Sequence, residues 1–215
     1  MTAPLETLRY TAGLVTSGEF WPHVYTTMQA FALALLIAAT AGPIMGATLG
    51  FHRVSGEAAE PVVVALYSIP KVTLYPIILL FFGLGLKAEV AFGALHGIVP
   101  IVLFTMNAVR NIKPVFIKTA RVMRLRPWPL FRTVLLPAAL PEIFTGLRVG
   151  FSVTLIGTLL SEMFGSKRGL GFLLMNALGV HSMDLIMAIT VLLVTFAAVT
   201  NSCLILIEHR LYRRA

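Results

Sequence analysis

Apolar residues form long runs along most of this chain, and the charged residues gather between those runs. Two of the runs, Val24 to Gly50 and Leu185 to Ile207, contain no charged side chain. Each exceeds the roughly 20 apolar residues that a helix needs to cross a bilayer. Since three further runs are nearly as apolar, the pattern predicts about five membrane-spanning helices. We expect these spans at Thr26–Leu49, Pro61–Leu84, Val90–Val109, Ile143–Ser161 and Leu185–Ile207.

The composition agrees with an all-α integral membrane protein. Of the 215 residues, 58% are hydrophobic and 12% are charged, whereas soluble domains carry roughly 25% charged residues. No stretch is typical of a separate soluble domain, so we expect one transmembrane domain over residues 1–215. Residues 1–23 lack the basic opening and apolar core of a cleaved signal peptide. The single cysteine, Cys203, excludes an intramolecular disulfide.

Lysine and arginine residues fall unevenly on the two sets of loops between the five predicted spans. One set holds eleven of them and the other holds four, and cytoplasmic loops are those that keep basic residues. This bias predicts that residues 1–23 lie outside the cytoplasm, and that residues 110–142 and the C-terminus lie inside it. The first set is Arg53, Arg110, Lys113, Lys118, Arg121, Arg124, Arg126, Arg132, Arg210, Arg213 and Arg214, and the second is Arg9, Lys87, Lys167 and Arg168.

Several classes of function are disfavoured by the same sequence. The net charge is +8, but the basic residues gather at the ends of apolar runs, which is not typical of a nucleic-acid-binding face. Four of the histidines are scattered without the spacing of metal ligands, so we expect no metal site. No serine–histidine–acid or paired-carboxylate arrangement is visible, so we do not expect an enzyme. Those histidines are His52, His96, His181 and His209.

Residues 110–142 form a 33-residue connection between the third and fourth spans, which is longer than two neighbouring helices require. On a helical wheel, Phe116, Ala120 and Met123 share one face, and the basic residues Lys118, Arg121 and Arg124 share the other. This pattern predicts an amphipathic helix at the membrane surface.

The second part of the same connection opens with Pro127 and Pro129. Prolines disfavour helical geometry in the residue before them and can begin a new helix, so PLFRTVLL is predicted as a second short helix set at an angle to the first. This helix is expected to end at Leu136 and Pro137, and the chain to re-enter the membrane after Pro141.

This helical elbow resembles the cytoplasmic EAA loop of permeases of binding-protein-dependent ABC importers. The family pattern is E-A-A, three residues, a glycine, and then a variable run that ends I-x-L-P. Counted back from Leu136 and Pro137, its E-A-A falls on Lys118, Thr119 and Ala120, and its glycine falls on Arg124. Lys118 therefore replaces the acid, and the bend that the glycine normally allows is expected to rest on Pro127 and Pro129. By this resemblance, the residues that couple the chain to an ATPase are Lys118, Ala120, Met123, Arg124, Leu125, Leu136 and Pro137.

Three further stretches are similar, in order and spacing, to the nitrate, sulfonate, taurine and thiamine-precursor branch of this superfamily. They are LYSIPKVTLYPIILLFFGLG (66–85), LLPAALPEIFTGLRVG (135–150) and LSEMFGSKRGLGFLL (160–174). That branch usually has a further N-terminal span, so the chain is expected to be either a natural five-span version or the product of a misplaced start.

The resemblance implies a type I importer with several partners. The chain has no G-x-x-x-x-G-K-[ST] phosphate loop, so it is expected to hold no cofactor itself, and ATP would bind a cytoplasmic ATPase dimer. A second permease chain, identical or different, and an extracytoplasmic solute-binding protein would complete the assembly in the bacterial inner membrane. The cargo would be a small solute, and anions and vitamin precursors are typical of the branch.

Polar side chains within the predicted spans are the candidates for a solute path, because such groups normally face the bundle interior or a water-filled path. Pro70 and Pro76 predict a second span that is kinked or locally unwound around Lys71. Lys71 could equally extend to the membrane interface, and Arg148 is more simply explained as reaching back to the headgroups. The candidates are Tyr67, Lys71, Tyr75, Asn107 and Arg148.

Small residues and one acid lead to further expectations. Gly42, Gly46 and Gly50 follow a four-residue spacing that lets another helix approach closely. We expect that helix to belong to the same chain rather than to a second copy in a dimer. Glu162 is expected at the outer end of the fourth span, in an exposed ion pair with Lys167 or Arg168; a docking or gating role is the alternative.

Two other classes of membrane protein compete with an importer permease. A self-sufficient secondary carrier or channel would normally place more ionisable groups in its spans or show repeated halves, and neither feature is present. A membrane anchor would need no cytoplasmic elbow for transport. A neighbouring gene for an ATPase and one for a secreted binding protein would favour the permease over both.

Overall fold

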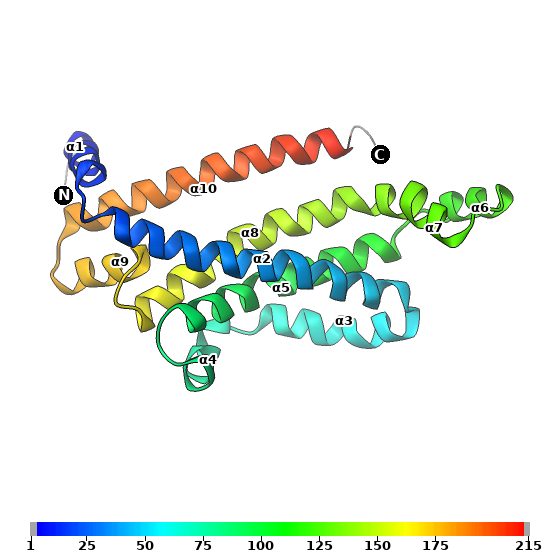
Figure 1. Ribbon diagram of the computed structural model, residues 1–215, viewed down its shortest axis with the longest axis horizontal. Coiled ribbons are helices and arrows are strands. Elements are labelled where there is room, and N and C mark those ends of the chain that lie inside the picture. Colours follow the sequence, from blue (N-terminus) through cyan, green and yellow to red (C-terminus); the bar gives the residue numbers. More distant parts are fainter. Residues whose placement is uncertain (1–3, 213–215) are drawn as a thin grey trace. The chain divides into compact units, whose positions relative to one another are not determined.

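The computed structural model describes residues 4–212, and this part of the chain contains helices and no strand. Figure 1 labels the α-helices along the chain. They are α1 (Pro4–Thr16), α2 (Trp21–Phe51), α3 (Arg53–Ser68), α4 (Tyr75–Phe82), α5 (Leu86–Arg110), α6 (Pro114–Val122), α7 (Pro127–Leu130), α8 (Leu136–Gly165), α9 (Leu170–Gly179) and α10 (Met183–Tyr212). Two further helical segments differ from the α-helix: η1 (Lys71–Leu74) is a tighter 3₁₀ helix, and η2 (Phe131–Leu135) is a wider π-helix.

Within residues 4–212, four helical segments are long and apolar enough to cross a membrane. They correspond to four of the predicted spans, and the fifth is accounted for if a bent pair of helices is counted as one span. The all-helical fold with four to five spans is therefore confirmed. The four segments are Trp21–Phe51, Leu86–Arg110, Pro127–Gly165 and Met183–Arg210.

The predicted kink or local unwinding of the second span near Lys71 is confirmed, and the two pieces form a bent pair that is one broken span or a re-entrant loop. Helix α3 begins at Arg53, earlier than predicted, and ends at Ser68. Ile69 adopts extended backbone angles, as expected for a residue before proline. Pro70 begins η1, and the left-handed Gly83 ends α4. Pro70 thus interrupts the helix where unwinding was predicted.

The predicted end of the elbow at Leu136 and Pro137 is also wrong. Helix α7, η2 and α8 form one continuous helical segment from Pro127 to Gly165, so the second part of the elbow is the beginning of the fourth span. Pro127 and Pro129 lie in its first turn, where a missing N–H costs little. Pro137 has no backbone N–H and cannot donate a hydrogen bond to the preceding turn. The wider π-helical turn η2 lies directly before it, and there the Leu136 N–H bonds the Phe131 carbonyl.

Two short helices, α1 and α9, lie where only loops were expected. Both fall outside the predicted spans, and α9 has only 10 residues, too few to cross a bilayer. The Trp21 indole N–H donates to the carbonyl of Val15, 3.0 Å away, and so joins the end of α1 to the start of α2.

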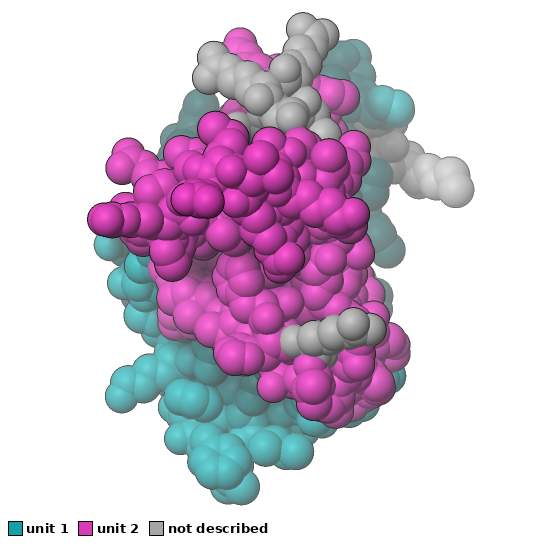
Figure 2. All heavy atoms as spheres, turned by 90° about the vertical axis from the view of Figure 1, so that its right-hand side faces the viewer, with its two compact units in different colours: residues 1–36, 70–96, 152–202 teal, residues 37–69, 97–151, 203–215 magenta. Residues whose placement is uncertain are grey.

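The chain divides into two compact units, which Figure 2 shows in different colours. Unit 1 comprises residues 1–36, 70–96 and 152–202, and unit 2 comprises residues 37–69, 97–151 and 203–215. Each unit has its own buried residues and is described by itself below.

Within unit 2, the glycine stripe of α2 packs against α5. A Cβ atom on Gly46 would lie 2.6 Å from the Val102 carbonyl oxygen and 2.6 Å from the Thr105 Cβ. Gly42 and Gly50 approach Ile101 and Val109 equally closely. The expected packing within the chain is therefore confirmed.

Candidate functional site

The elbow's first helix, α6, lies in unit 2 and begins at Pro114, whose missing N–H suits the first turn of a helix. Its end is a Schellman motif: the Leu125 N–H bonds the Ala120 carbonyl at 3.1 Å, and the Arg124 N–H bonds the Arg121 carbonyl at 3.0 Å. Arg124 itself has a φ of +50°, in the left-handed region. The bend after α6 therefore rests on Arg124, and the expectation that Pro127 and Pro129 supply it is wrong.

Most of the surface of α6 is exposed. Ala120 is buried and Ile117 is half-buried, and Ile117 packs against the small core formed by Ala108, Ile112 and Ala139. The predicted apolar face is only partly correct, because Phe116 and Met123 are exposed together with the basic residues. The outward surface is thus a mixture of apolar and basic groups. Its members are Val115, Phe116, Lys118, Arg121, Val122, Met123 and Arg124.

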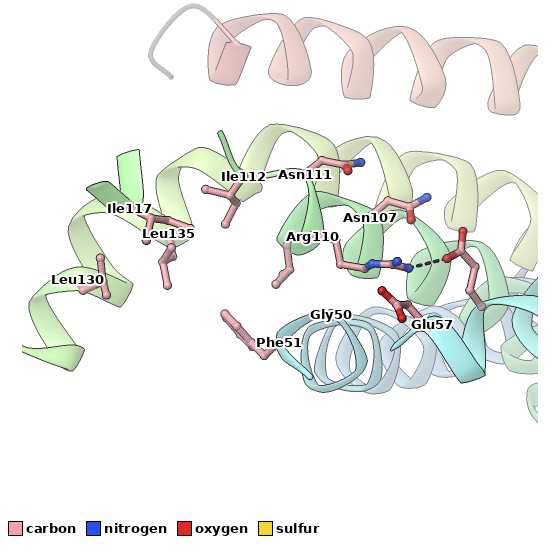
Figure 3. A pocket seen from close by; sticks show the side chains of 12 residues that line it. Gly50, Phe51, Glu57, Asn107, Arg110, Asn111, Ile112, Ile117, Leu130 and Leu135 are labelled. Atoms are coloured by element: carbon pink, nitrogen blue, oxygen red, sulfur yellow. Dashed lines mark hydrogen bonds and ion pairs between the residues drawn. The ribbon is translucent and has the colours of Figure 1, made fainter. Parts of the chain in front are cut away.

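A cavity of about 740 Å³ lies behind α6, within unit 2. Figure 3 shows Ile117, Leu130 and Leu135 of the elbow on one side of it. Polar groups from α3 and α5 line another side, where Arg110 pairs with Glu60. This pocket opens to the surface and separates Ile117, Leu130 and Leu135 from the polar groups of α3 and α5.

The other predicted coupling residues lie on the same elbow. Leu125 is half-buried in the turn after α6, whereas Leu136 and Pro137 are exposed at the start of α8. Lys118 is exposed in the middle of α6. The fold thus brings the whole predicted coupling set into one connected part of unit 2, and its coupling role stays a prediction.

The path candidates in unit 2 occupy different environments. Tyr67 is exposed on α3, and Asn107 lines the cavity described above. The Nε atom of Arg148 lies 2.7 Å from a carboxylate oxygen of Glu208 on α10. Thr145 also donates a hydrogen bond to Glu208.

The path candidates in unit 1 are Lys71 and Tyr75. Lys71 is half-buried at the start of η1. Tyr75 is buried, its hydroxyl donates to the Ser161 carbonyl at 2.9 Å, and its ring packs edge-on against Phe92. Contact of any of the five candidates with a solute stays a prediction.

Sequence reasoning missed a buried polar cluster in unit 1. Glu162 is fully buried, and one of its oxygens accepts hydrogen bonds from the Thr27 hydroxyl and the Gly171 N–H, each at 2.9 Å. The expected exposed ion pair with Lys167 or Arg168 is therefore wrong. A hint lies in the glycines Gly165, Gly169 and Gly171 that follow Glu162, because glycine runs mark close backbone approach. No group of three or more potential metal ligands occurs within residues 4–212.

Comparison with known proteins matches residues 34–215 to the family model of the binding-protein-dependent transport system inner membrane component. The chain belongs to this family. The elbow lies between the spans formed by α5 and α8 and is exposed. It contains the loop pattern on which the resemblance to this family rests. The chain is thus a multi-pass inner-membrane permease of the ABC importer class.

Named relatives agree with this membership. The permease is 26% identical to the putative aliphatic sulfonates transport permease protein SsuC of Bacillus subtilis, over 93% of this chain and 72% of the relative. It is 36% identical to the riboflavin transport system permease protein RibX of Chloroflexus aurantiacus, over 89% of this chain and 70% of the relative.

Solved structures support the fold. The methionine ABC transporter MetNI, in inward-facing conformations, matches with a TM-score of 0.76 at 19% identity, over 91% of this permease and 99% of that chain. An amino acid ABC transporter crystallised with histidines matches with a TM-score of 0.68 at 16% identity, over all of both chains.

Proposed function

We propose that this permease forms half of the membrane passage of an ATP-driven importer and that its elbow, α6 to η2, is the part held by the ATPase. Two permease chains, identical or different, would pair and bind an ATPase dimer on the cytoplasmic side. A binding protein would deliver the solute from the other side. This chain would bind no nucleotide itself.

The observation that carries the proposal is the exposed elbow in a chain of the permease family. Helix α6 presents apolar and basic groups together, with Val122 84% exposed and Met123 65% exposed. Such a mixed surface is typical of a protein contact with an apolar centre and a polar rim.

The mechanism follows from the continuity of the elbow with the fourth span. A force applied to α7 reaches α8 directly, since Pro127–Gly165 is one helical segment, and α6 is joined to that segment by the short turn at Arg124. The cavity behind α6 gives the elbow space to move when the ATPases close. Transport is then a switch between two packings of the helices, and no bond in the solute is made or broken.

The relatives outline the range of solutes without fixing one. Their names include aliphatic sulfonates, taurine and nitrate, all of them anions or zwitterions with an anionic group, and also riboflavin. We propose a small solute of this range, with Tyr67, Lys71, Tyr75, Asn107 and Arg148 as the residues to test for contact with it.

A charge placed on α6 tests the docking role. Val122→Asp should weaken copurification of the ATPase by roughly 30-fold or more, because an unpaired charge buried in an interface costs about 2 kcal/mol or more. Val180→Asp is the matched control, since Val180 is also an exposed valine at the end of a short helix and is 66% exposed. The control should retain the ATPase, and both variants should reach the membrane in wild-type amounts.

Charged replacements of Leu136 and Pro137 should also release the ATPase without affecting membrane insertion. If Val122→Asp copurifies with the ATPase and imports normally, the elbow is not the docking part. If the purified permease alone concentrates a solute in vesicles without ATP, it is a secondary carrier instead.

A further inference from the structure

A second, smaller cavity of unit 2 lies between α2, α5 and the start of α8. It has a volume of about 230 Å³ and is lined by α2, by residues within 105–112 at the end of α5, and by residues within 131–143 of η2 and α8. Of the described residues that line it, none is charged and Thr105 alone is polar. Ile44, which is 65% exposed, and Phe51, which is 51% exposed, bring the cavity to the surface. We call this cavity the apolar groove.

The length of the apolar groove matches one leaflet of a bilayer. Along the fourth span the groove extends from Phe131 to Ile143, which is about 18 Å at 1.5 Å per residue. Along α2 it extends from Pro43 to Phe51, which is about 12 Å. The hydrocarbon core of a bilayer is about 30 Å thick, so one leaflet contributes about 15 Å. An acyl chain that enters at the membrane surface would therefore follow the groove through most of its leaflet.

The end of the groove at Phe131 carries side chains that are typical of the membrane surface. Trp128 is 69% exposed, and its ring stacks on that of Phe131 with the centroids 6.0 Å apart. Tryptophan is enriched at the level of the lipid headgroups. Arg132 is exposed beside Phe131 and stands one turn before Leu136, another residue that lines the groove. The groove therefore begins at headgroup level, with a guanidinium group beside its entrance.

The charge of the elbow favours an anionic occupant. From Arg110 to Pro141 the chain has basic residues and no acidic one. Glu57 and Glu60 line the larger cavity and not this groove, and Glu60 is paired with Arg110. In a symmetric pair, a second copy of the chain would bring the same basic elbow to the same place, which like-charge repulsion disfavours. A lipid phosphate supplies the opposite charge, and basic pockets between spans on the cytoplasmic side bind such headgroups.

We propose that the apolar groove binds one acyl chain of an anionic phospholipid of the cytoplasmic leaflet, with Arg132 at the lipid phosphate. The acyl chain would lie against α2 on one side and against η2 and the start of α8 on the other. This inference goes beyond the proposed function, because it requires the predicted orientation of the chain but no ATPase on the elbow.

The test measures the lipid that stays bound to the purified permease. Native mass spectrometry counts it after exchange into micelles that contain equal amounts of phosphatidylglycerol, which is anionic, and phosphatidylethanolamine, which has no net charge. Ala47→Phe fills the groove, and Ala39→Phe is its matched control, because both alanines are half-buried on α2 and Ala39 does not line the groove. Arg132→Gln removes the charge at the entrance, and Arg121→Gln does the same at an exposed arginine of α6. Thermal unfolding shows which variants are folded.

We expect the wild type to retain phosphatidylglycerol in preference to phosphatidylethanolamine. Ala47→Phe should retain roughly 5-fold less of either lipid, because extra atoms in a filled site are strongly unfavourable. Arg132→Gln should still bind lipid, but its preference for phosphatidylglycerol should fall by roughly 5-fold, the factor for one basic residue at an anionic surface. Both controls should match wild type. Since the acyl chain and the phosphate belong to one lipid, Arg132→Gln should have little further effect once Ala47→Phe is present.

A photoreactive lipid locates the site and keeps the test decisive if Ala47→Phe does not fold. Phosphatidylglycerol with a diazirine at the end of one acyl chain should crosslink to α2 near Ile44 or to α8 near Ile143, at the deep end of the groove. Crosslinks confined to other segments would overturn the inference. So would equal retention of the two lipids by wild type, or equal retention of lipid by folded Ala47→Phe and Ala39→Phe.

A second permease chain is the competing occupant of the groove. Ile44→Cys, in a chain whose Cys203 is replaced by serine, should react with a membrane-permeable maleimide and form no disulfide-linked dimer under oxidation in membranes. A dimer linked through this cysteine would show that a second copy covers the groove, and the lipid site would then be wrong. None of these measurements involves the ATPase, so failure of the proposed coupling role would leave their results unchanged.

Discussion

At the scale of single residues, Arg124 and His181 share one unusual conformation. Both have positive φ angles, +50° and +56°, and each stands just beyond the end of a short helix in a Schellman motif. Glycine is the residue that usually takes this place, because it has no Cβ to clash. Arg124 is also the position of the glycine in the family's loop pattern. The bend is therefore retained although the residue has changed.

Replacing Arg124 by glycine should stabilise the permease. A non-glycine residue in the left-handed region costs roughly 1–2 kcal/mol, and glycine gives back part of this gain through its larger loss of entropy on folding. We expect the free energy of unfolding in detergent to rise by about 0.5–1 kcal/mol. Arg121→Gly is the control: Arg121 lies inside α6, and glycine there should lower the same quantity by up to about 1 kcal/mol. Equal effects of the two variants would contradict the role of φ.

At the scale of helices, the contact of α2 with α5 depends on glycines of α2, which have no side chain to hold the two helices apart. Lipid tails are as apolar as leucine, so close backbone approach and packing drive association between membrane helices. Gly46 faces the backbone of Val102, which cannot turn aside as a long side chain would.

Adding one methyl group to this contact should therefore be costly. In Gly46→Ala the new Cβ would lie 2.6 Å from the Val102 carbonyl oxygen, and we expect the free energy of unfolding to fall by about 1–3 kcal/mol, as for other overpacked sites. Gly13→Ala in α1 is the control, because nothing lies within 4 Å of that position. It should be neutral or gain up to about 1 kcal/mol of helix propensity. A neutral Gly46→Ala would show that α2 and α5 are not packed this closely.

At the scale of the whole molecule, the sequence predicted the features that depend on local composition. The spans follow from apolar runs, and the elbow follows from a long basic connection, so both could be read along the chain. The unwinding near Lys71 could be read from Pro70, but the anchoring of α4 could not, because it depends on the distant contact of Tyr75 with Ser161. Glu162 was assigned to the surface for the same reason. Its burial depends on α9 folding back onto Thr27, which no local pattern encodes.

The distribution of basic residues makes a prediction about the molecule as a whole, namely which ends of the spans face the cytoplasm. Arg124 and Lys167 are both exposed and should lie on opposite sides of the membrane. Single cysteines at these positions can be labelled separately once Cys203, which is exposed on α10, is replaced by serine. A maleimide that does not cross membranes should label Lys167→Cys in intact cells with a permeable outer membrane, and Arg124→Cys only in inside-out vesicles.

The reverse labelling would place the elbow outside the cell, where no ATPase can reach it. The family fold would then stand, but the proposed coupling role of α6 would fail, because it requires the ATPase on the predicted side. Labelling of both cysteines in intact cells would instead indicate leaky membranes, which a cytoplasmic marker protein carrying one exposed cysteine detects in the same sample. The coupling role therefore depends on the orientation of the chain, which is predicted from eleven basic residues against four by the positive-inside rule.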